Sequence, residues 1–561
     1  MDIKNIKKID LLLGIIVIIF FFWILLKYTV NIPVNDDYGV LDNFNKLICS
    51  NSFSEKLKFL FAQHNEHRIV YDRLWFLISY KINSQINFNL LSFVGNLSLL
   101  GIFLLLRKRT LIFKDNYFIL FPLSVLIFNL SFHENITFPM ASLANFTVIL
   151  FSLLSIYYLT LEEKKAKNIL FSLIFFLFAV YTQAGGLFVL PTALVLLFLR
   201  KEYKTMLYFA IVGFLICLIY FIGYEKPFNS PSIIQSISSY NINSLLYTIT
   251  FLGNAFANNL IYTNNASVSI LVSSIVGAIF LLIYFYQLKC KYYNRNAFNF
   301  SVMTLVIVLS IITGITRSGL GLETAISSRY RIISVLFFIS VLILLFEFIK
   351  LKKINGLKIN GLIVLFTVFY FFNYSYSQEQ YLYFREKQSI KGVVNYYSGN
   401  HKLLNGFQQD YYKQVLEKSN EEETYYLPLK EEIDQNLPLS SPINIKTTNL
   451  ESTSLNVTID EVTKLYDSYY IEGWAFIDDI ETLNQKVYIG LNNNNNYTFF
   501  NTKQVNRYDL NPYFKKNYLK RGGFFARIKL ENINQGLNKI TVFVENTGTK
   551  KMIETDKDIT N

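Results

Sequence analysis

Long apolar segments separated by short polar loops fill the first two thirds of this 561-residue chain and stop near Ser377. A segment of about 18 or more mostly apolar residues can cross a bilayer as an α-helix. A further segment at 244–262 is apolar but broken by Gly and Asn, which predicts a re-entrant or interfacial helix, with a twelfth span as the alternative. The sequence therefore predicts a polytopic α-helical membrane protein with about eleven spans, at residues 10–29, 88–106, 115–132, 144–161, 168–183, 186–200, 205–224, 267–287, 298–316, 331–349 and 357–376.

Basic residues gather in the loops on one side of this predicted bundle. "KNIKK", "RKRTLIFK", "EEKKAK", "RKEYK", "KCKYYNR" and "KLKKINGLK" alternate with loops near 133–143 and 182–186 that contain no Lys or Arg. Because basic loops stay in the cytoplasm, we expect a cytoplasmic N-terminus and, with an odd number of spans, an extracytoplasmic region after Ser377. The basic loops that set the orientation of the protein in the membrane account for much of the net charge of +13, so nucleic acid is not an expected partner.

The chain after the last predicted span has two parts. Residues 377–450 are polar, with a helical pattern, and predict a linker region. Residues 451–561 alternate with period two, as in "YYIEGWAF", "KVYIGL" and "KITVFVEN", which predicts a small antiparallel β-sandwich on the extracytoplasmic side. The run Asn492–Asn496 predicts a hairpin loop, and Trp474 is either a sugar-stacking residue or part of the core.

The first predicted outer loop, residues 30–87, carries an unusual set of ionisable groups. It opens with "NDDY", which places Asp36 and Asp37 at the membrane surface. "QHNEHRIVYDRLWFLISYKI" follows, and helical spacing would place His64, His67 or Arg68, and Tyr71 on one face. Its apolar residues would let such a helix lie on the membrane surface: Ile69, Leu74, Trp75, Leu77 and Ile78. The alternative is a solvated loop followed by an ordinary amphipathic helix.

Two later outer loops repeat the theme. "HENITFPMASLANF" presents His133 and Glu134, and "RSGLGLETAISSRYRIIS" presents three arginines between two spans. Arginines on the outer side oppose the charge bias, which predicts either binding of an anionic phosphate or snorkelling anchors. Because the polar groups gather on one side, we expect an outer-face enzyme; a transporter would place them near the middle of its spans.

With "NDDY" opening the first outer loop, "HNEHR" within it and "SRYR" before a late span, residues 1–376 resemble the GT-C superfamily of polytopic membrane glycosyltransferases. The likeness is to bacterial enzymes that decorate cell-wall polysaccharide, teichoic acid or O-antigen. The resemblance implies an enzyme of the cytoplasmic membrane that moves a sugar from a polyprenyl-phosphate donor onto a cell-surface glycan acceptor. No "WWDYG"-type motif is present in the sequence, so transfer to protein Asn is not expected.

The resemblance also implies roles for individual residues. Asp36 or Asp37 would be the general base, with Asp36 slightly favoured, and some members of the superfamily bind a divalent metal such as Mg or Mn, for which Asp36, Asp37 and Glu66 are candidates. Contacts to the donor phosphate or substrate would come from His64, Glu66, His67, Arg68, His133, Glu134, Arg329, Tyr330 and Arg331. A base must reach the attacking hydroxyl, and cations stabilise the leaving phosphate.

Three other functions remain open. A polysaccharide polymerase or ligase would also use arginines in outer loops and a lipid-linked donor. A flippase or transporter of lipid-linked sugars would need polar groups within the spans, and these are scarce. A scaffold for wall synthesis would leave Asp36 and Asp37 without a role.

Overall fold

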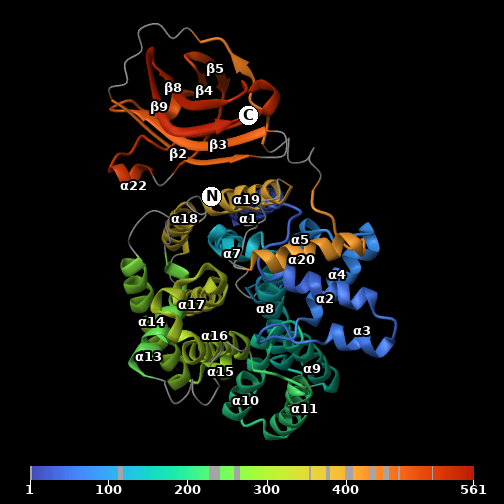
Figure 1. Cartoon of the computed structure of the whole chain (residues 1–561). Coiled ribbons are helices and arrows are strands. Elements are labelled where there is room, and N and C mark those ends of the chain that lie inside the picture. Colours follow the sequence, from blue (N-terminus) through green and yellow to red (C-terminus); the bar gives the residue numbers. More distant parts are fainter. Residues whose placement is uncertain are drawn as a thin grey trace. The chain divides into compact units, whose positions relative to one another are not determined.

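The computed structural model describes the chain except for residues 1–2, 111–117, 164, 227–240, 258–265, 353–355, 375–378, 398–407, 429–436, 446–453, 465–467 and 508–509. It forms two compact units (Figure 1). Of the described residues, those within 3–257, 266–387 and 414–426 belong to the helical unit, and those within 388–413 and 427–561 belong to the second unit.

Within the described residues, seven helices are long and apolar enough to cross a membrane, which supports a multi-pass membrane protein. They are α1 (Ile3–Tyr28), α5 (Phe88–Thr110), α8 (Pro139–Leu159), α11 (Tyr203–Phe221), α14 (Ala266–Lys289), α16 (Ala297–Arg317) and α17 (Arg331–Lys352). Four shorter apolar helices are α9 (Ala166–Val180), α10 (Val189–Leu199), α13 (Ile242–Leu252) and α18 (Gly356–Tyr374). The count of eleven spans stays a prediction.

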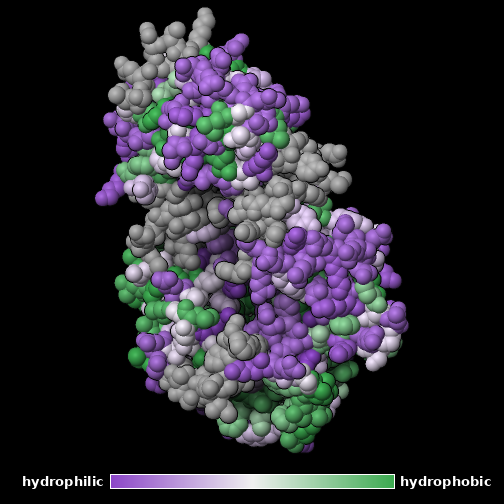
Figure 2. Space-filling view, viewed as in Figure 1, coloured by the Kyte–Doolittle hydropathy of each residue, from purple (hydrophilic) through white to green (hydrophobic). Residues whose placement is uncertain are grey.

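Exposed apolar side chains support the membrane assignment. Leu207 and Phe214 of α11 are 61% and 59% exposed, and Leu282 of α14 is 70% exposed. Figure 2 shows hydrophobic residues gathered over α10 and α11, whereas hydrophilic residues cover α2 and α20. Helices of this composition are stable only when their exposed faces lie in lipid or against other protein.

The predicted span at 115–132 is not one continuous helix. Its described part contains α6 (Leu120–Ile127) and a 3-10 turn, η2 (Leu130–Phe132). The helix begins where the Asp10 carboxylate accepts hydrogen bonds from the backbone N–H groups of residues 119, 120 and 121, at 3.1, 3.0 and 2.8 Å. At 1.5 Å per residue, eight residues cover roughly 12 Å, which is too short to cross a bilayer alone.

The first predicted outer loop folds as α2 (Asp37–Cys49), α3 (Phe53–Leu60) and α4 (Val70–Asn83). The expectation of a helix through "HNEHR" was wrong. His64 and His67 exchange backbone hydrogen bonds, N to O, at 2.7 and 2.9 Å, and Asn65 between them has a φ of 49°. Asn tolerates this left-handed backbone, so the segment closes as a tight turn and the helix starts only at Val70.

Helices α3 and α4 each leave an apolar stripe uncovered. Phe53, Leu57 and Phe61 recur every four residues and are 76%, 40% and 41% exposed. On α4, Leu74, Ile78 and Ile82 repeat the same spacing and are also exposed. This spacing places each set on one helix face, as the prediction of a surface-lying α4 requires.

Several short elements lie at the ends of the long helices: α7 (His133–Ile136), η3 (Ala184–Phe188), η4 (Asn254–Phe256) and η7 (Ser328–Tyr330). We call one group of these elements the polar end of the helical unit. It consists of α7, η3 and η7 together with the start of α2. They rest on a core of apolar side chains from α1, α5, α6, α8, α16 and α17. Other described short helices are α15 (Tyr292–Arg295), η5 (Ser318–Leu320) and η6 (Leu322–Ile326).

The predicted linker contains α19 (Glu379–Tyr397) and α20 (Gln409–Glu421). The chain just after α20 is fastened to α2: Thr424 Oγ1 donates to Asn45 Oδ1 at 2.5 Å, and Asn45 Nδ2 donates to Ser419 Oγ at 2.8 Å. Asn45 is fully buried. Part of the predicted linker is therefore an integral part of the helical unit.

The second unit contains two antiparallel sheets with strand orders β1-β5-β4-β8-β9 and β2-β3-β7-β6. Both sheets contribute to one core, which includes Ile471 and Ala526 from one and Ile489 and Val542 from the other. The predicted two-sheet domain is thus present. Its strands are β1 (Pro442–Ile443), β2 (Leu455–Lys464), β3 (Ser468–Ile477), β4 (Lys486–Asn493), β5 (Asn496–Asn501), β6 (Lys503–Val505), β7 (Gly523–Lys529), β8 (Leu537–Asn546) and β9 (Thr549–Thr560), with a short helix α22 (Leu510–Phe514).

Two local predictions in this unit can be checked directly. Strands β4 and β5 are joined by Asn494 and Asn495, with φ of 49° and 69°, as a two-residue hairpin turn requires. The expected hairpin loop is therefore confirmed. Trp474 is half-buried and packs on Phe476 and Phe514, with ring centroids 5.8 and 5.3 Å away, as a core residue would.

Candidate functional site

The paired acids lie at the start of α2, and their carboxylates have different surroundings. Asp37 is fully buried and accepts hydrogen bonds from the backbone N–H groups of Val34 and Met140, both at 2.9 Å. Met140 belongs to the first turn of α8, whose N–H groups have no partner within the helix. Burial raises the pKa of Asp37 to about 8 in spite of these two donors. Asp37 therefore joins α2 to α8.

Asp36 is the residue immediately before α2, and its side chain does not cap the helix. The carboxylate is exposed and accepts no hydrogen bond from the part of the chain that the structure describes. Nearby protein still limits the water around this carboxyl, and the desolvation raises its pKa, with a smaller lowering by Arg329 and a raising contribution from Glu66. Asp36 is thus an available carboxyl close to one cation and one further acid.

The acid that acts on Asp36 belongs to the turn from His64 to His67. Glu66, at its tip, forms an ion pair with Arg317 at the end of α16, at 3.3 Å. Burial lowers the pKa of His64 to about 3 and also lowers that of His67. Both imidazoles are therefore neutral near pH 7, and neither supplies the positive charge expected of a phosphate ligand.

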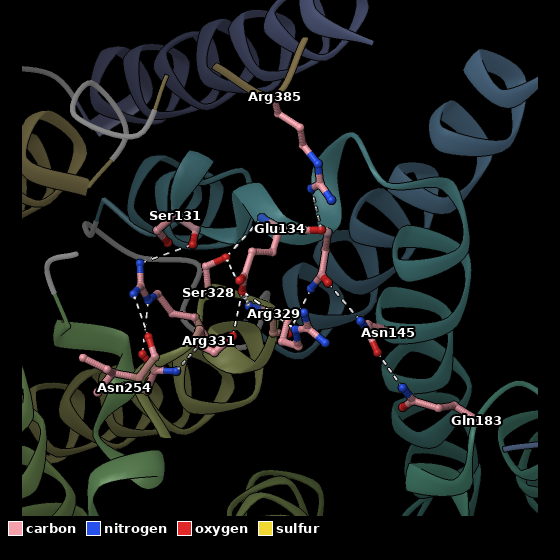
Figure 3. Close-up of polar contacts among 12 residues, drawn as sticks. Ser131, Glu134, Asn145, Gln183, Asn254, Ser328, Arg329, Arg331 and Arg385 are labelled. Carbon is pink, nitrogen blue, oxygen red and sulfur yellow. Dashed lines mark hydrogen bonds and ion pairs between the residues drawn. The ribbon is translucent and has the colours of Figure 1, made fainter. Parts of the chain in front are cut away.

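Arg68 and Arg331 are buried and bind the protein itself. The Arg68 guanidinium donates to the carbonyl oxygens of residues 61, 220 and 222 at 2.5–2.7 Å. Arg331 is fully buried and donates to Asn254 Oδ1 and to the carbonyl oxygens of residues 131 and 326 at 3.2–3.3 Å (Figure 3). These contacts favour structural roles for both residues over the predicted contact with a donor phosphate.

Glu134 holds η7 to α7 (Figure 3). Its Oε2 accepts hydrogen bonds from Ser327 Oγ, Ser328 Oγ and the backbone N–H of Arg329, at 2.6, 2.9 and 2.8 Å. Burial alone would raise its pKa, but His133, Arg329 and the hydrogen-bond donors outweigh that effect and lower it to about 2. Glu134 is therefore ionised and positions Arg329.

Two arginines leave their guanidinium groups partly accessible at this place. The Arg329 side chain is 48% exposed, and its Nε lies 3.9 Å from Glu134 Oε2. Arg317 is 32% exposed and lies over the ring of Tyr330, 5.9 Å from the centroid. Of the residues predicted to meet a phosphate, Arg329 is the one whose placement suits that role, with Tyr330 beside it.

Arg385 was not predicted as a site residue from the sequence. It comes from α19, after the last predicted span, and its Nη1 donates to the carbonyl oxygen of Glu134 at 3.1 Å (Figure 3). The nearby Tyr381 stacks on His133 with ring centroids 4.1 Å apart. Burial lowers the pKa of Arg385, and Glu134 and Asp37 counteract this effect. The motif "YLYFREK" contains Arg385, but nothing in its sequence predicted that this segment would contact α7.

Asp72 and Arg73 on α4 were also missed. Asp72 is fully buried, and neither carboxylate oxygen has a hydrogen-bond donor among the described residues. Burial raises its pKa well above the ordinary value; Arg73 lowers it by less, and nearby Asp37 adds to the increase. Arg73 points elsewhere, donating to the carbonyl oxygens of Leu60 and Ala62.

The expected metal ligands do not come together. Asp37 uses both oxygens on backbone N–H groups, which leaves Asp36 and Glu66 of the three candidates, and Arg329 and Arg317 stand beside them. Among the described residues, no three His, Cys, Asp or Glu side chains gather as a ligand set. These donors do not fit the predicted Mg or Mn ion, so we derive no step through a metal.

Comparison with protein-family models, with curated proteins and with solved structures found no match to this chain. The function is therefore inferred from the geometry of the polar end. There an available carboxyl, a second acid and two partly exposed guanidinium groups lie together on a protein whose described helices include seven that are long and apolar enough to cross a membrane.

Proposed function

We propose that the protein is a membrane glycosyltransferase that moves a sugar from a polyprenyl-phosphate donor onto a cell-surface glycan. The observation that carries this proposal is Asp36: a carboxyl with no hydrogen bond from the described residues, a raised pKa, and Arg329 close by. A general base works best when its pKa is near the working pH. A guanidinium group is suited to a phosphate because its planar donors match the phosphate oxygens.

In the proposed reaction, Asp36 takes the proton from an acceptor hydroxyl. The oxygen attacks the anomeric carbon of the donor sugar, the bond between that carbon and the phosphate oxygen breaks, and polyprenyl phosphate leaves. Arg329 and Arg317 stabilise the negative charge that grows on the phosphate. A single displacement of this kind inverts the anomeric centre.

The remaining parts of the proposal follow from the charge pattern of the loops. The polar end would face outward from the cytoplasmic membrane, the N-terminus would be cytoplasmic, and the β-domain would be extracytoplasmic. The apolar stripes on α3 and α4 support this placement because they suit the headgroup boundary of the membrane, where a lipid-linked phosphate lies. The fold of the helical unit would then be that of the GT-C superfamily.

Sugar analysis of the surface polysaccharide from a deletion strain tests the proposal. The strain is complemented with wild type, Asp36→Asn or the matched control Asp42→Asn. Asp42 lies on the same helix and pairs with Lys46 at 2.6 Å. We expect one sugar to be missing from the deletion strain, restored by wild type and Asp42→Asn, and still missing with Asp36→Asn.

Membrane levels of each variant are compared by immunoblot. If Asp36→Asn restores the polysaccharide fully, the base is misassigned, and a flippase or a scaffold explains the protein better. If the deletion shortens the polysaccharide chains without removing a sugar, the protein is a polymerase or ligase.

A further inference from the structure

A chain of side-chain amides runs from Arg329 across the polar end. Asn135 Nδ2 donates to the carbonyl oxygen of Arg329 at 2.9 Å, and Asn145 Nδ2 donates to Asn135 Oδ1 at 2.9 Å. Gln183 Nε2 donates to Asn145 Oδ1 at 2.5 Å. Figure 3 shows Arg329, Asn145 and Gln183 in succession along this chain. Three elements contribute to it, η7, α7 and α8, together with Gln183, the residue before η3.

The outer two amides keep hydrogen-bonding capacity that the described protein does not use. Asn135 is fully buried, whereas Asn145 and Gln183 are half-buried. An amide offers two N–H donors and one carbonyl acceptor. Within the described residues, Asn145 has one N–H unused, and Gln183 has one N–H and its Oε1 unused.

The polar end therefore changes character over a short path. At Arg329 it is cationic and partly exposed, and at Asn145 and Gln183 it is neutral, with donors and an acceptor. A sugar phosphate has the complementary sequence of groups: an anion, then hydroxyls that both donate and accept. In half-buried amides these unused donors and the unused acceptor are open to water, and a sugar hydroxyl can take the place of that water.

We infer that Asn145 and Gln183 form the subsite for the sugar hydroxyls of a lipid-linked sugar phosphate whose phosphate lies at Arg329. This inference rests on the proposed function and adds the residues that recognise the sugar. Gly185 lies beside this subsite: a Cβ at this position would be 3.2 Å from Gln183 Oε1, so a larger residue there would shift the amide by a few tenths of an ångström.

The test measures binding of two lipids to the full chain in lipid nanodiscs. One probe is polyprenyl phosphate, and the other is a panel of polyprenyl-phosphate monosaccharides carrying a hexose, an N-acetylhexosamine or a pentose. Wild type should bind at least one sugar-bearing lipid more tightly than the sugarless lipid. Gln183→Ala and Asn145→Ala should weaken binding of that lipid about 3- to 10-fold, as expected for one lost hydrogen bond, and leave the sugarless lipid unchanged.

Two further variants serve as checks. Gln183→Met keeps the volume of the side chain without its hydrogen bonds, and it should behave like Gln183→Ala. Asn299→Ala removes a buried amide that bridges Tyr292 Oη and the carbonyl oxygen of Ser340, far along α16 from its Arg317 end, and should bind both lipids as wild type does.

The possible failures are distinct. Equal loss for both lipids, or no loss in the Gln183 variants, overturns the sugar subsite while leaving the proposed transferase intact. The proposed function fails, and the subsite fails with it, if wild type binds neither lipid. The same conclusion follows if Arg329→Ala binds both lipids as tightly as wild type does.

Discussion

The carboxylates of Asp36 and Asp37 are adjacent in sequence but differ in their use. Asp37 is fully buried and accepts two backbone hydrogen bonds that join α2 to α8, whereas the exposed carboxylate of Asp36 accepts none from the described residues. One acid thus holds the local fold in place, and the other remains available for chemistry. The sequence pattern alone could not separate these roles.

The first prediction contrasts the two acids. Asp36→Asn should keep the stability of wild type and lower sugar transfer by roughly 100-fold or more, because a general base contributes about that factor. Asp37→Asn should lower the free energy of unfolding by about 1–3 kcal/mol, because its NH2 group would face a backbone N–H. Thermal unfolding of the purified chain and transfer rates at equal protein amounts check both outcomes. A stable, inactive Asp37→Asn beside an active Asp36→Asn would reverse the assignment.

A second prediction separates the two arginines of "SRYR". Arg331→Ala should destabilise the helical unit by roughly 3 kcal/mol. The substitution removes a fully buried side chain and leaves the three oxygens that accept its hydrogen bonds without this donor. Arg329→Ala removes an exposed ion pair of 3.9 Å, which contributes less than about 1 kcal/mol to stability. It should instead weaken binding of polyprenyl phosphate. Unfolding curves and lipid-binding curves for both variants measure the contrast, and a stability loss in Arg329→Ala equal to that of Arg331→Ala would contradict it.

A third prediction concerns Glu134, which holds the backbone of Arg329. Glu134→Gln should cost about 1–3 kcal/mol of stability near pH 7, because the amide cannot accept three hydrogen bonds as well as the carboxylate does. The folded pKa of about 2 lies below the unfolded value near 4.3, so this stabilisation is present above pH 4.3 and is lost as pH falls towards 2. The difference in the free energy of unfolding between wild type and Glu134→Gln should therefore become smaller at acid pH. Unfolding at pH 7 and at pH 3 measures it; a gap of the same size at both would argue against an ionised Glu134.

Period and composition predict much of the architecture. The long apolar helices, the period-two strands and the Asn494–Asn495 turn all follow from local patterns. The turn at Asn65 did not, because a helical spacing of His64, His67 and Tyr71 says nothing about a left-handed residue between them. Local backbone hydrogen bonding there overrode the amphipathic pattern.

The site was predictable in part for a different physical reason. The acids and arginines of the candidate site were singled out because ionisable groups close to predicted spans are costly unless they are solvated or paired. Their partners were not, since Glu134 binds Ser327 and Ser328 across more than 190 residues of sequence. Arg385 and the amides Asn135 and Asn145 likewise join the site only through the tertiary fold.

The last prediction uses Asp72, a fully buried carboxyl without a hydrogen-bond donor among the described residues. Burial raises its folded pKa well above the unfolded value near 3.9. At pH values below the unfolded pKa, Asp72 is protonated in both the folded and the unfolded protein, so its burial involves no cost of removing a charge from water. As pH rises from there towards the folded pKa, wild type loses up to about 1.4 kcal/mol per pH unit relative to a neutral side chain. Asp72→Asn should therefore match wild type near pH 4 and be more stable at pH 8, and Asp72→Glu, which keeps the charge, should show no such gain. Unfolding midpoints of the three proteins from pH 4 to pH 8 decide the matter. An Asp72→Asn variant that is less stable than wild type at pH 8 would mean that Asp72 is ionised in the folded protein.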